Sequence, residues 1–227
     1  MVFVETLVSS IDSLLGGGVE TGVLTQVYGV AGSGKTSIAL QCALNCMSKK
    51  WKVIFIDADC SFSRRRFTQI SSRFRKLDLS RFILLKPKSF SEQSDAIDSI
   101  GVLAKEGVRL IILDSVGSLY RCSVGQDRIE NVYFNKELCR QMATLLYLSE
   151  ELDLATMILN QVSGDPLQKS EIGYVPVGHQ VVDPWCGVSL RLERLTAPPG
   201  RRAVLEKHNS RPAGSSAMFS PNDLGAS

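Results

Sequence analysis

Long apolar runs, paired cysteines and abundant histidines are all missing from this chain of 227 residues. No apolar stretch approaches the roughly 20 residues that a membrane-spanning helix needs. The first residues, Met1–Glu5, have no basic segment followed by an apolar run, so we expect no secretion signal. The six cysteines form no C-x-x-C pair and there are two histidines, which gives a zinc site little support. These absences favour a cytoplasmic protein with reduced, buried thiols.

The composition is that of an ordinary globular protein. Hydrophobic residues make up 44% and charged residues 22% of the chain, which excludes a disordered or fibrous protein. The length predicts a single domain spanning residues 1–227, with a core large enough to need no disulfides. The formal charge of +3 permits a nucleic-acid partner without arguing for one.

Short apolar runs alternate with segments of helical spacing through the first two thirds of the chain. Nearly continuous apolar runs are typical of strands that are covered on both faces. The predicted strands are Leu24–Tyr28, Val53–Ile56, Phe82–Leu85, Leu110–Leu113 and Thr156–Leu159. The predicted helices are Thr36–Met47, Ser63–Lys76, Ser91–Lys105 and Glu130–Leu152. The alternation predicts an α/β fold: a mostly parallel central sheet with helices on both faces.

The pattern changes after Asn160. Residues Val162–Asp183 are rich in glycine, proline, serine and charge, so we predict a long loop, and long loops in compact domains are usually functional or mobile. Three short strands are then expected, with a turn at Pro198–Gly200 between the first two. These strands form a small antiparallel extension: Ser189–Arg194, Ala203–Lys207 and Ala217–Phe219. The tail, Pro221–Ser227, is expected to be frayed.

The strongest motif is the segment Gly29–Thr36, which fits G-x-x-x-x-G-K-[ST] between a strand and a helix. Glycines allow the backbone to wrap a polyphosphate with its N–H groups turned inward, and the helix adds the positive end of its dipole. Lys35 would supply a charge to the outer phosphates and Thr36 a hydroxyl to Mg²⁺. The predicted nucleotide-binding residues are Gly29, Val30, Ala31, Gly32, Ser33, Gly34, Lys35, Thr36 and Ser37.

Polar residues end three of the predicted strands. Asp114 ends an apolar strand, which is the arrangement of a carboxylate that supports magnesium beside a phosphate loop. Asp57 and Asp59 leave another strand, and alternation along an extended chain points them the same way. One of them is a candidate for orienting the attacking water, although Asp57 equally fits a turn or a helix N-cap. Gln161 either senses the terminal phosphate or simply belongs to a turn.

Together these segments resemble the core of the RecA-type recombinases, in the same order along the chain. The matching residues are Ser10–Gly18, Gly22–Tyr28, Gly29–Thr36, Phe55–Asp59, Ile111–Ser115 and Asn160–Val162. The ending, Ala203–Gly214, is similar to that of the archaeal RadB family of recombinase paralogues, which also lack an N-terminal domain. The resemblance covers nearly the whole chain. It implies a RecA-type P-loop ATPase core.

The resemblance also implies roles for single residues. Lys35 and Thr36 match the phosphate lysine and the magnesium hydroxyl, and Asp114 matches the second magnesium residue, the Walker-B aspartate. Asp59 stands where most relatives have the catalytic glutamate, so Lys35, Asp59 and Gln161 form the expected catalytic set. Arg66 matches an arginine that stacks on adenine. Tyr120–Tyr133 and Val162–Gln180 occupy the places of the DNA-binding loops.

These matches imply an ATP-binding accessory protein of DNA repair and homologous recombination, with ATP and Mg²⁺ as cofactors. Asp59 is one methylene shorter than glutamate, and the recombinases carry an N-terminal domain and a polymerisation segment that Met1–Ser9 does not match. We therefore expect weak ATPase activity, weak binding of single-stranded or branched DNA and no strand exchange. Implied partners are the RadA recombinase, a Holliday-junction resolvase and a second copy of the chain. The alternatives are an active recombinase and a signalling ATPase of the circadian-clock type.

Basic residues cluster in two parts of the sequence. For Arg73, Arg75 and Lys76 we favour a solvated helix face, whereas Arg201, Arg202 and Arg211 fit a solvated face and phosphate contacts equally well. The loop Val162–Gln180 holds one aromatic residue, Tyr174, besides Lys169 and His179. Proteins that bind single strands usually combine basic charge with several stacking aromatics. This composition is the reason for expecting weak DNA binding.

Overall fold

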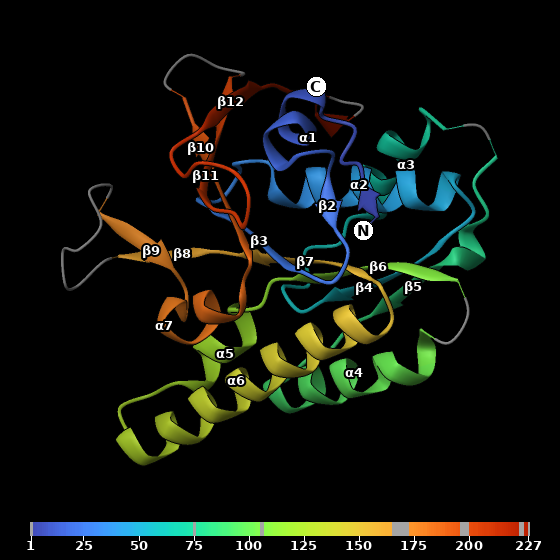
Figure 1. The fold of residues 1–227 in the computed structure, drawn as a ribbon. Coiled ribbons are helices and arrows are strands. Elements are labelled where there is room, and N and C mark those ends of the chain that lie inside the picture. The colour runs from blue at the N-terminus through green and yellow to red at the C-terminus, as the bar shows by residue number, and fades with distance from the viewer. Residues whose placement is uncertain are drawn as a thin grey trace.

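A mixed sheet forms the centre of the molecule (Figure 1). The computed structural model describes residues 2–74, 76–104, 107–164, 173–195, 200–222 and 225–226. Within these ranges the sheet has eight strands in the order β12-β11-β10-β3-β7-β6-β4-β5. They are β3 (Leu24–Gly29), β4 (Lys52–Asp57), β5 (Phe82–Leu85), β6 (Val108–Asp114), β7 (Ala155–Asn160), β10 (Val188–Arg194), β11 (Arg201–Lys207) and β12 (Ser216–Phe219).

The strands from β10 to β5 in this order are parallel, and β10, β11 and β12 pair antiparallel. This arrangement confirms the predicted α/β class with a small antiparallel extension. Every residue of β3 and β7 is buried, because these central strands are covered on both faces. Their mostly apolar sequences, without a regular alternation of polar residues, follow from that double burial. The polar residues that they contain, such as Gln26, are buried as well.

Helices cover both faces of the sheet (Figure 1). One face carries α1 (Ser9–Leu15), α2 (Lys35–Ser48) and α3 (Arg64–Ser71), and the other carries α4 (Phe90–Leu103), α5 (Ser118–Ser123), α6 (Arg128–Glu151) and α7 (His179–Val182). Each face has its own apolar cluster, with Ile38 and Leu40 of α2 in one and Ile97 and Leu145 in the other. Burying one such side chain contributes about 1.5–3 kcal/mol. Two single 3-10 turns, Leu79–Arg81 and Asp183–Trp185, connect elements.

Two sequence predictions differ from the structure in extent. The helix predicted over Ser63–Lys76 is α3, which ends at Ser71. The segment Val162–Asp183 is not a plain loop, because β8 (Val162–Gly164) pairs antiparallel with β9 (Tyr174–Pro176) and α7 follows. Such short strands depend on pairing across a gap in the sequence, which local composition does not report. Residues 165–172, including Lys169, lie outside the described ranges, as do Arg75 and most of the predicted turn at Pro198–Gly200.

The predicted fraying of Pro221–Ser227 is wrong for the described part of that segment. There β13 (Pro221–Asn222) pairs with β14 (Gly225–Ala226). The buried Gln41 side chain of α2 donates to the Ala226 carbonyl oxygen at 3.1 Å and accepts from the Ala226 N–H at 2.8 Å. A distant side chain therefore supplies the hydrogen bonds that hold this end of the chain.

At the other end of the chain, a small ribbon joins β1 (Phe3–Val4) to β2 (Val19–Glu20) in antiparallel register. None of the helices in the described ranges combines the length and the apolar character that crossing a membrane would require.

Candidate nucleotide-binding site

The loop between β3 and α2 is shaped by its glycines. A Cβ atom on Gly29 would come within 2.2 Å of the carbonyl oxygen of Leu192 on β10, so only glycine fits there. Gly34, the N-cap of α2, has a φ of 107°, in the region that side chains disfavour. Gly34 also leaves the first turn of this 14-residue helix without a side-chain cap. Backbone N–H groups at such a helix start are suited to binding an anion.

A pocket of about 220 Å³ opens beside this loop. Its walls come from the loop, the first turn of α2 and the C-terminal part of the chain: Gly32, Gly34, Lys35, Thr36, Ser37, Arg201 and Pro221. The Lys35 ammonium group donates to the carbonyl oxygens of Gly29 and Val30 at 2.7 and 3.1 Å. Burial lowers the pKa of Lys35, and the nearby carboxylates of Asp114 and Asp59 oppose this effect. The pocket therefore combines backbone donors with a held ammonium group, which suits a polyphosphate.

A hydroxyl and a carboxylate meet at the edge of the pocket. The Thr36 hydroxyl donates to Asp114 at 2.8 Å, and the Ser61 hydroxyl lies 3.4 Å from the same oxygen. Burial raises the pKa of Asp114 to about 6, with a further contribution from the charges of Asp59 and Asp57. Mg²⁺ is usually held by one or two protein oxygens together with phosphates and water. The pair fits such an ion, while the described residues contain no cluster of three or more His, Cys, Asp or Glu that would hold a metal alone.

Asp59 and Gln161, which the sequence assigns to one site, are in direct contact. The Gln161 side-chain amide donates to both Asp59 carboxylate oxygens, at 3.2 and 3.0 Å. The hydroxyl of Ser118, at the start of α5, donates to the same carboxylate at 2.6 Å. Sequence reasoning missed Ser118, because a serine shortly after a strand end carries no motif. Its role depends on a contact across 59 positions of the chain.

Asp57 behaves as the turn residue that the sequence left open. Its buried carboxylate accepts from the backbone N–H groups of Ser61 and Phe62 at 2.9 and 3.2 Å, and Lys86 lies 3.7 Å away. Strand β4 ends at Asp57, so the alternation argument does not extend to Asp59. The two carboxylates have different partners, and Asp57 holds the turn that carries Asp59.

Two arginines lie near the pocket. The Arg66 guanidinium donates to the Asn222 carbonyl oxygen at 2.8 Å and lies 3.5 Å from the Ser37 hydroxyl. The chain thus places Arg66 between the start of α2 and the C-terminal segment. Arg201, which the sequence assigned to a solvated face or to DNA, donates to the Gly32 carbonyl oxygen at 3.3 Å. No local pattern marks Arg201 as a neighbour of the phosphate loop, because β11 reaches the loop only through the folded sheet.

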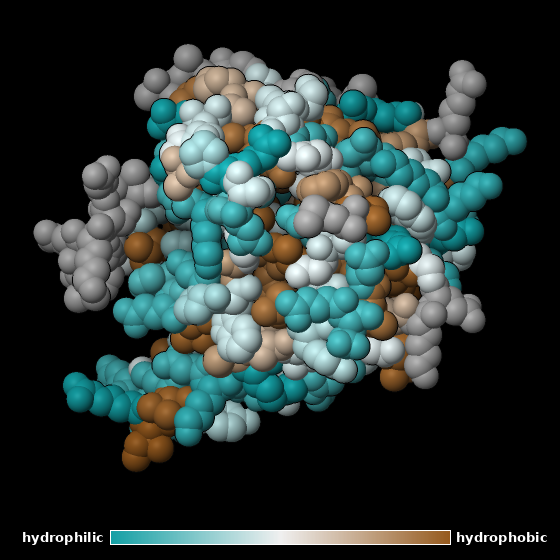
Figure 2. All heavy atoms as spheres, in the orientation of Figure 1, coloured by the Kyte–Doolittle hydropathy of each residue, from teal (hydrophilic) through white to brown (hydrophobic). Residues whose placement is uncertain are grey.

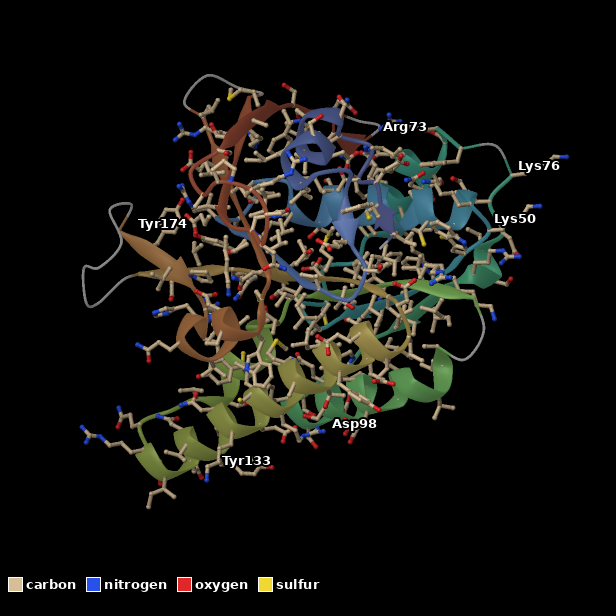
Figure 3. All side chains as sticks on the ribbon, in the orientation of Figure 1. Lys50, Arg73, Lys76, Asp98, Tyr133 and Tyr174 are labelled. Atoms are coloured by element: carbon tan, nitrogen blue, oxygen red, sulfur yellow. The ribbon has the colours of Figure 1, made fainter. Side chains whose placement is uncertain are left out.

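In their described parts, the segments that the sequence assigns to DNA consist mostly of helices and short strands. Tyr120–Tyr133 consists of the end of α5, a short connection and the first turns of α6. In Figure 3, Tyr174 of β9 lies on the opposite side of the molecule from Lys76, which points outward. Exposed Lys76, beyond the end of α3, is therefore remote from β9, in line with a solvated position. Arg202 pairs with Glu193 at 2.6 Å, and Arg211 donates to the Ser13 carbonyl oxygen at 2.9 Å.

Comparison with known proteins places this geometry in a family. The Rad51 family model matches residues 1–194. The DNA repair and recombination protein RadB of Methanococcoides burtonii is 37% identical over 218 residues, which are 95% of this chain and 94% of that protein. RadB of Thermococcus kodakarensis is 38% identical over 225 residues, 97% of each chain. A crystal structure of the RadB recombinase superposes with a TM-score of 0.83 at 35% identity, covering 99% of this chain and 98% of that one.

The chain belongs to the RadB branch of the Rad51 family. It is therefore a member of a family of DNA repair and recombination proteins. The RecA-like fold of RadB, with its mostly parallel sheet, is the fold described above. The fold of the Rad51 family generally implies ATP with Mg²⁺, which agrees with the chemistry of the Gly29–Thr36 loop and of Asp114.

Proposed function

We propose that this RadB-family chain is an ATP-binding accessory protein of homologous recombination. The observation that carries the proposal is the pair formed by Thr36 and Asp114, 2.8 Å apart at the edge of a glycine-lined pocket that also holds Lys35. A bound Mg²⁺ would neutralise phosphate charge in this pocket. The residues that would hold it are Thr36 and Asp114, and Lys35 with the loop N–H groups would bind the phosphates.

Slow hydrolysis follows from the state of Asp59. A general base must reach the water whose proton it takes. The Asp59 carboxylate is short, and Gln161 and Ser118 already donate three hydrogen bonds to it. These donors occupy the carboxylate oxygens with which a general base would have to take the proton from water. We therefore propose that Asp59 holds its neighbours in place more than it activates water.

The proposed role is conformational. ATP would act on the turn that carries Asp59 and on the segment that begins at Gln161, and so change the affinity of the chain for weakly bound DNA or for a partner. The RadA recombinase and a Holliday-junction resolvase are the partners that the family resemblance implies. We propose that Arg66, whose guanidinium lies 3.5 Å from the Ser37 hydroxyl at the start of α2, contributes to the adenosine side of the site.

Calorimetry with ATP and Mg²⁺ tests the proposal directly. The purified chain is expected to bind ATP, and Lys35→Ala to weaken binding by about tenfold or more, because a charge-assisted hydrogen bond contributes about 1.5–3 kcal/mol. Lys50→Ala, at an exposed lysine that points away from the body of the protein (Figure 3), is the matched control and should bind normally. Absence of binding by the folded parent protein would exclude the proposal. Robust DNA-stimulated turnover with strand exchange would instead identify an active recombinase.

A further inference from the structure

Ser118 joins the nucleotide site to a helix that takes no part in binding the phosphates. It is the first residue of α5, and its hydroxyl donates to Asp59 at 2.6 Å. Gln161, the other donor to Asp59, precedes β8. One carboxylate therefore holds the beginnings of two different segments, which are separated by more than forty positions in the sequence.

The direction of the hydrogen bonds defines a short relay. A hydroxyl has one proton to donate, and Ser118 uses it on Asp59. In the contact of 2.6 Å between the Ser115 and Ser118 hydroxyls, Ser115 must therefore be the donor. Ser115 directly follows Asp114, and the Asp59 N–H donates to the Asp114 carbonyl oxygen at 3.0 Å. The relay therefore runs from Ser115, which follows the candidate Mg²⁺ ligand Asp114, through the Ser118 hydroxyl to the Asp59 carboxylate.

We propose that Ser118 is a positioning residue that couples the state of the nucleotide site to α5 through Asp59. The inference rests on the nucleotide site proposed above and specifies how that site is regulated. A bound nucleotide with its cation would bring charge beside Asp59. If the Asp59 carboxylate turned toward that charge, its hydrogen bonds with Ser118 and Gln161 would lengthen or bend. The bond from Ser118 passes that change to the start of α5, while the bonds from Gln161 pass it to the segment before β8.

The chain supplies its own reporter for this coupling. Among the described residues Cys60 and Cys122 are the exposed cysteines, Cys139 is half-buried, and the other three are buried. Cys122 belongs to α5, one turn beyond Ser118. Cys60 lies next to Asp59, so it is replaced by serine. In the Cys60→Ser protein, an environment-sensitive fluorophore attached to Cys122 then reports on α5. A second sample that carries both Cys60→Ser and Cys122→Ser measures any signal from a fluorophore on Cys139.

The test compares ATP binding with the response of α5. Addition of ATP with Mg²⁺ to the labelled Cys60→Ser protein is expected to change the fluorescence at the concentrations at which calorimetry detects binding. When Ser118→Ala is added to this protein, the affinity for ATP should stay within about threefold of that of the labelled Cys60→Ser protein. The fluorescence change should be smaller by about fivefold or more, which is the usual scale of coupling between sites. Ser118→Thr, which keeps the hydroxyl, should restore the response.

Ser123→Ala is the matched control. Ser123 lies on the same helix, but its hydroxyl donates to the Leu119 carbonyl oxygen of α5 itself at 3.0 Å. This variant should respond like the parent. A full response in Ser118→Ala, or no response in a parent that binds ATP, would overturn the coupling while leaving the nucleotide site intact. A folded parent that binds no ATP would overturn the proposed function itself.

Discussion

At the scale of single residues, the nucleotide-binding site contains charged side chains that are buried, so burial opposes their charged forms. Asp114 is 2% exposed and shares its surroundings with Asp57 and Asp59. Taking a carboxylate out of water destabilises its charged form, and like charges nearby add to the effect. Lys35 is 8% exposed and bonded to backbone carbonyls, and burial lowers its pKa. Such perturbed groups cluster where a ligand supplies the missing opposite charge.

Asp114→Asn is expected to stabilise the chain in the absence of nucleotide. The folded pKa of about 6 lies above the ordinary 3.8, so the fold favours the protonated carboxyl group. The stability of the parent should fall as the pH rises from about 4 to about 6, by up to about 3 kcal/mol. Urea unfolding of both proteins across this range measures the difference. The asparagine protein should be the more stable one above about pH 6, with the advantage vanishing near pH 4.

Asp114→Asn should also abolish the magnesium-dependent part of ATP binding, because the ionised Asp114 carboxylate is the group that attracts the cation. In the parent, this part should weaken as the pH falls below about 6, since protonation removes the charge. Calorimetry with and without Mg²⁺ at several pH values makes the measurement. A variant that retains magnesium-dependent binding would show that Asp114 has no part in it.

Asp59→Glu is expected to raise the rate of ATP hydrolysis by about tenfold, a modest part of what a well-placed general base contributes. The longer side chain would bring a carboxylate nearer to the nucleotide. Steady-state phosphate release measures the effect. Asp59→Asn, which has the original length but no basicity, should not raise the rate. An unchanged or lower rate in Asp59→Glu would show that another step, such as assembly, limits turnover.

At the scale of elements, helix α2 organises both the phosphate pocket and the C-terminal segment. Its first turn supplies Lys35, Thr36 and Ser37 to the pocket. In the next turn, the buried Gln41 binds Ala226 and also donates to the Leu7 carbonyl oxygen at 3.0 Å. The two ends of the chain therefore meet on the helix that begins at the phosphate loop.

Gln41→Ala is expected to lower the free energy of unfolding by about 1–3 kcal/mol, because it leaves buried backbone groups of the terminal segments without partners. Chemical denaturation measures the loss, and limited proteolysis should show cleavage after Pro221 at lower protease concentrations. Gln126→Ala, at an exposed position before α6, provides the control and should change stability little. Equal stability of both variants would mean that the tail needs no anchor on α2.

At the scale of the whole molecule, exposed apolar residues and exposed arginines are distributed unevenly over the surface. Figure 2 shows apolar atoms gathered at the free tip of α6, where Ile129, Val132 and Tyr133 are 82%, 51% and 64% exposed. Exposed Arg121 and Arg128 both precede these three residues in the sequence. Exposed Arg64 and Arg65 belong to α3, which lies on the face of the sheet opposite α6 (Figure 1). Exposed basic charge and an exposed aromatic residue, Tyr133, thus lie together at the start of α6, whereas the aromatic residues near α3, such as Phe62 and Phe67, are partly buried against the core.

This distribution predicts weak, salt-dependent binding of single-stranded DNA near α5. The logarithm of affinity should fall with the logarithm of salt concentration with a slope of about −2, equivalent to about three phosphate contacts. Arg121→Ala should make the slope shallower by about 0.7, the value for one contact. Lys76→Ala, on the remote side of the molecule, should leave the slope unchanged. Fluorescence anisotropy across a salt series gives both slopes, and a flat dependence would contradict the electrostatic account.

Features that depend on residues close together in the sequence could be predicted from the sequence alone. The strands β3 to β7 could be predicted because strands inside a covered sheet are short and mostly apolar. The phosphate loop could be predicted because its glycines, lysine and threonine act at fixed local spacing. Asp114 followed from its place at a strand end beside that loop. The resemblance to the RecA-type recombinases assigned Asp59 and Gln161 to one site, and their side chains are in contact in the fold.

The tertiary structure alone decided the contacts between distant positions. Ser118 on Asp59, Arg201 on Gly32 and Gln41 on Ala226 join residues separated by 59, 169 and 185 positions. Such a hydrogen bond depends on a side chain arriving within about 3 Å of a side-chain or backbone partner that is distant in the sequence. That condition is set by the packing of whole elements, which no local pattern of residue types encodes. The phosphate site is therefore visible in the sequence, whereas the groups that hold it in place appear only in the fold.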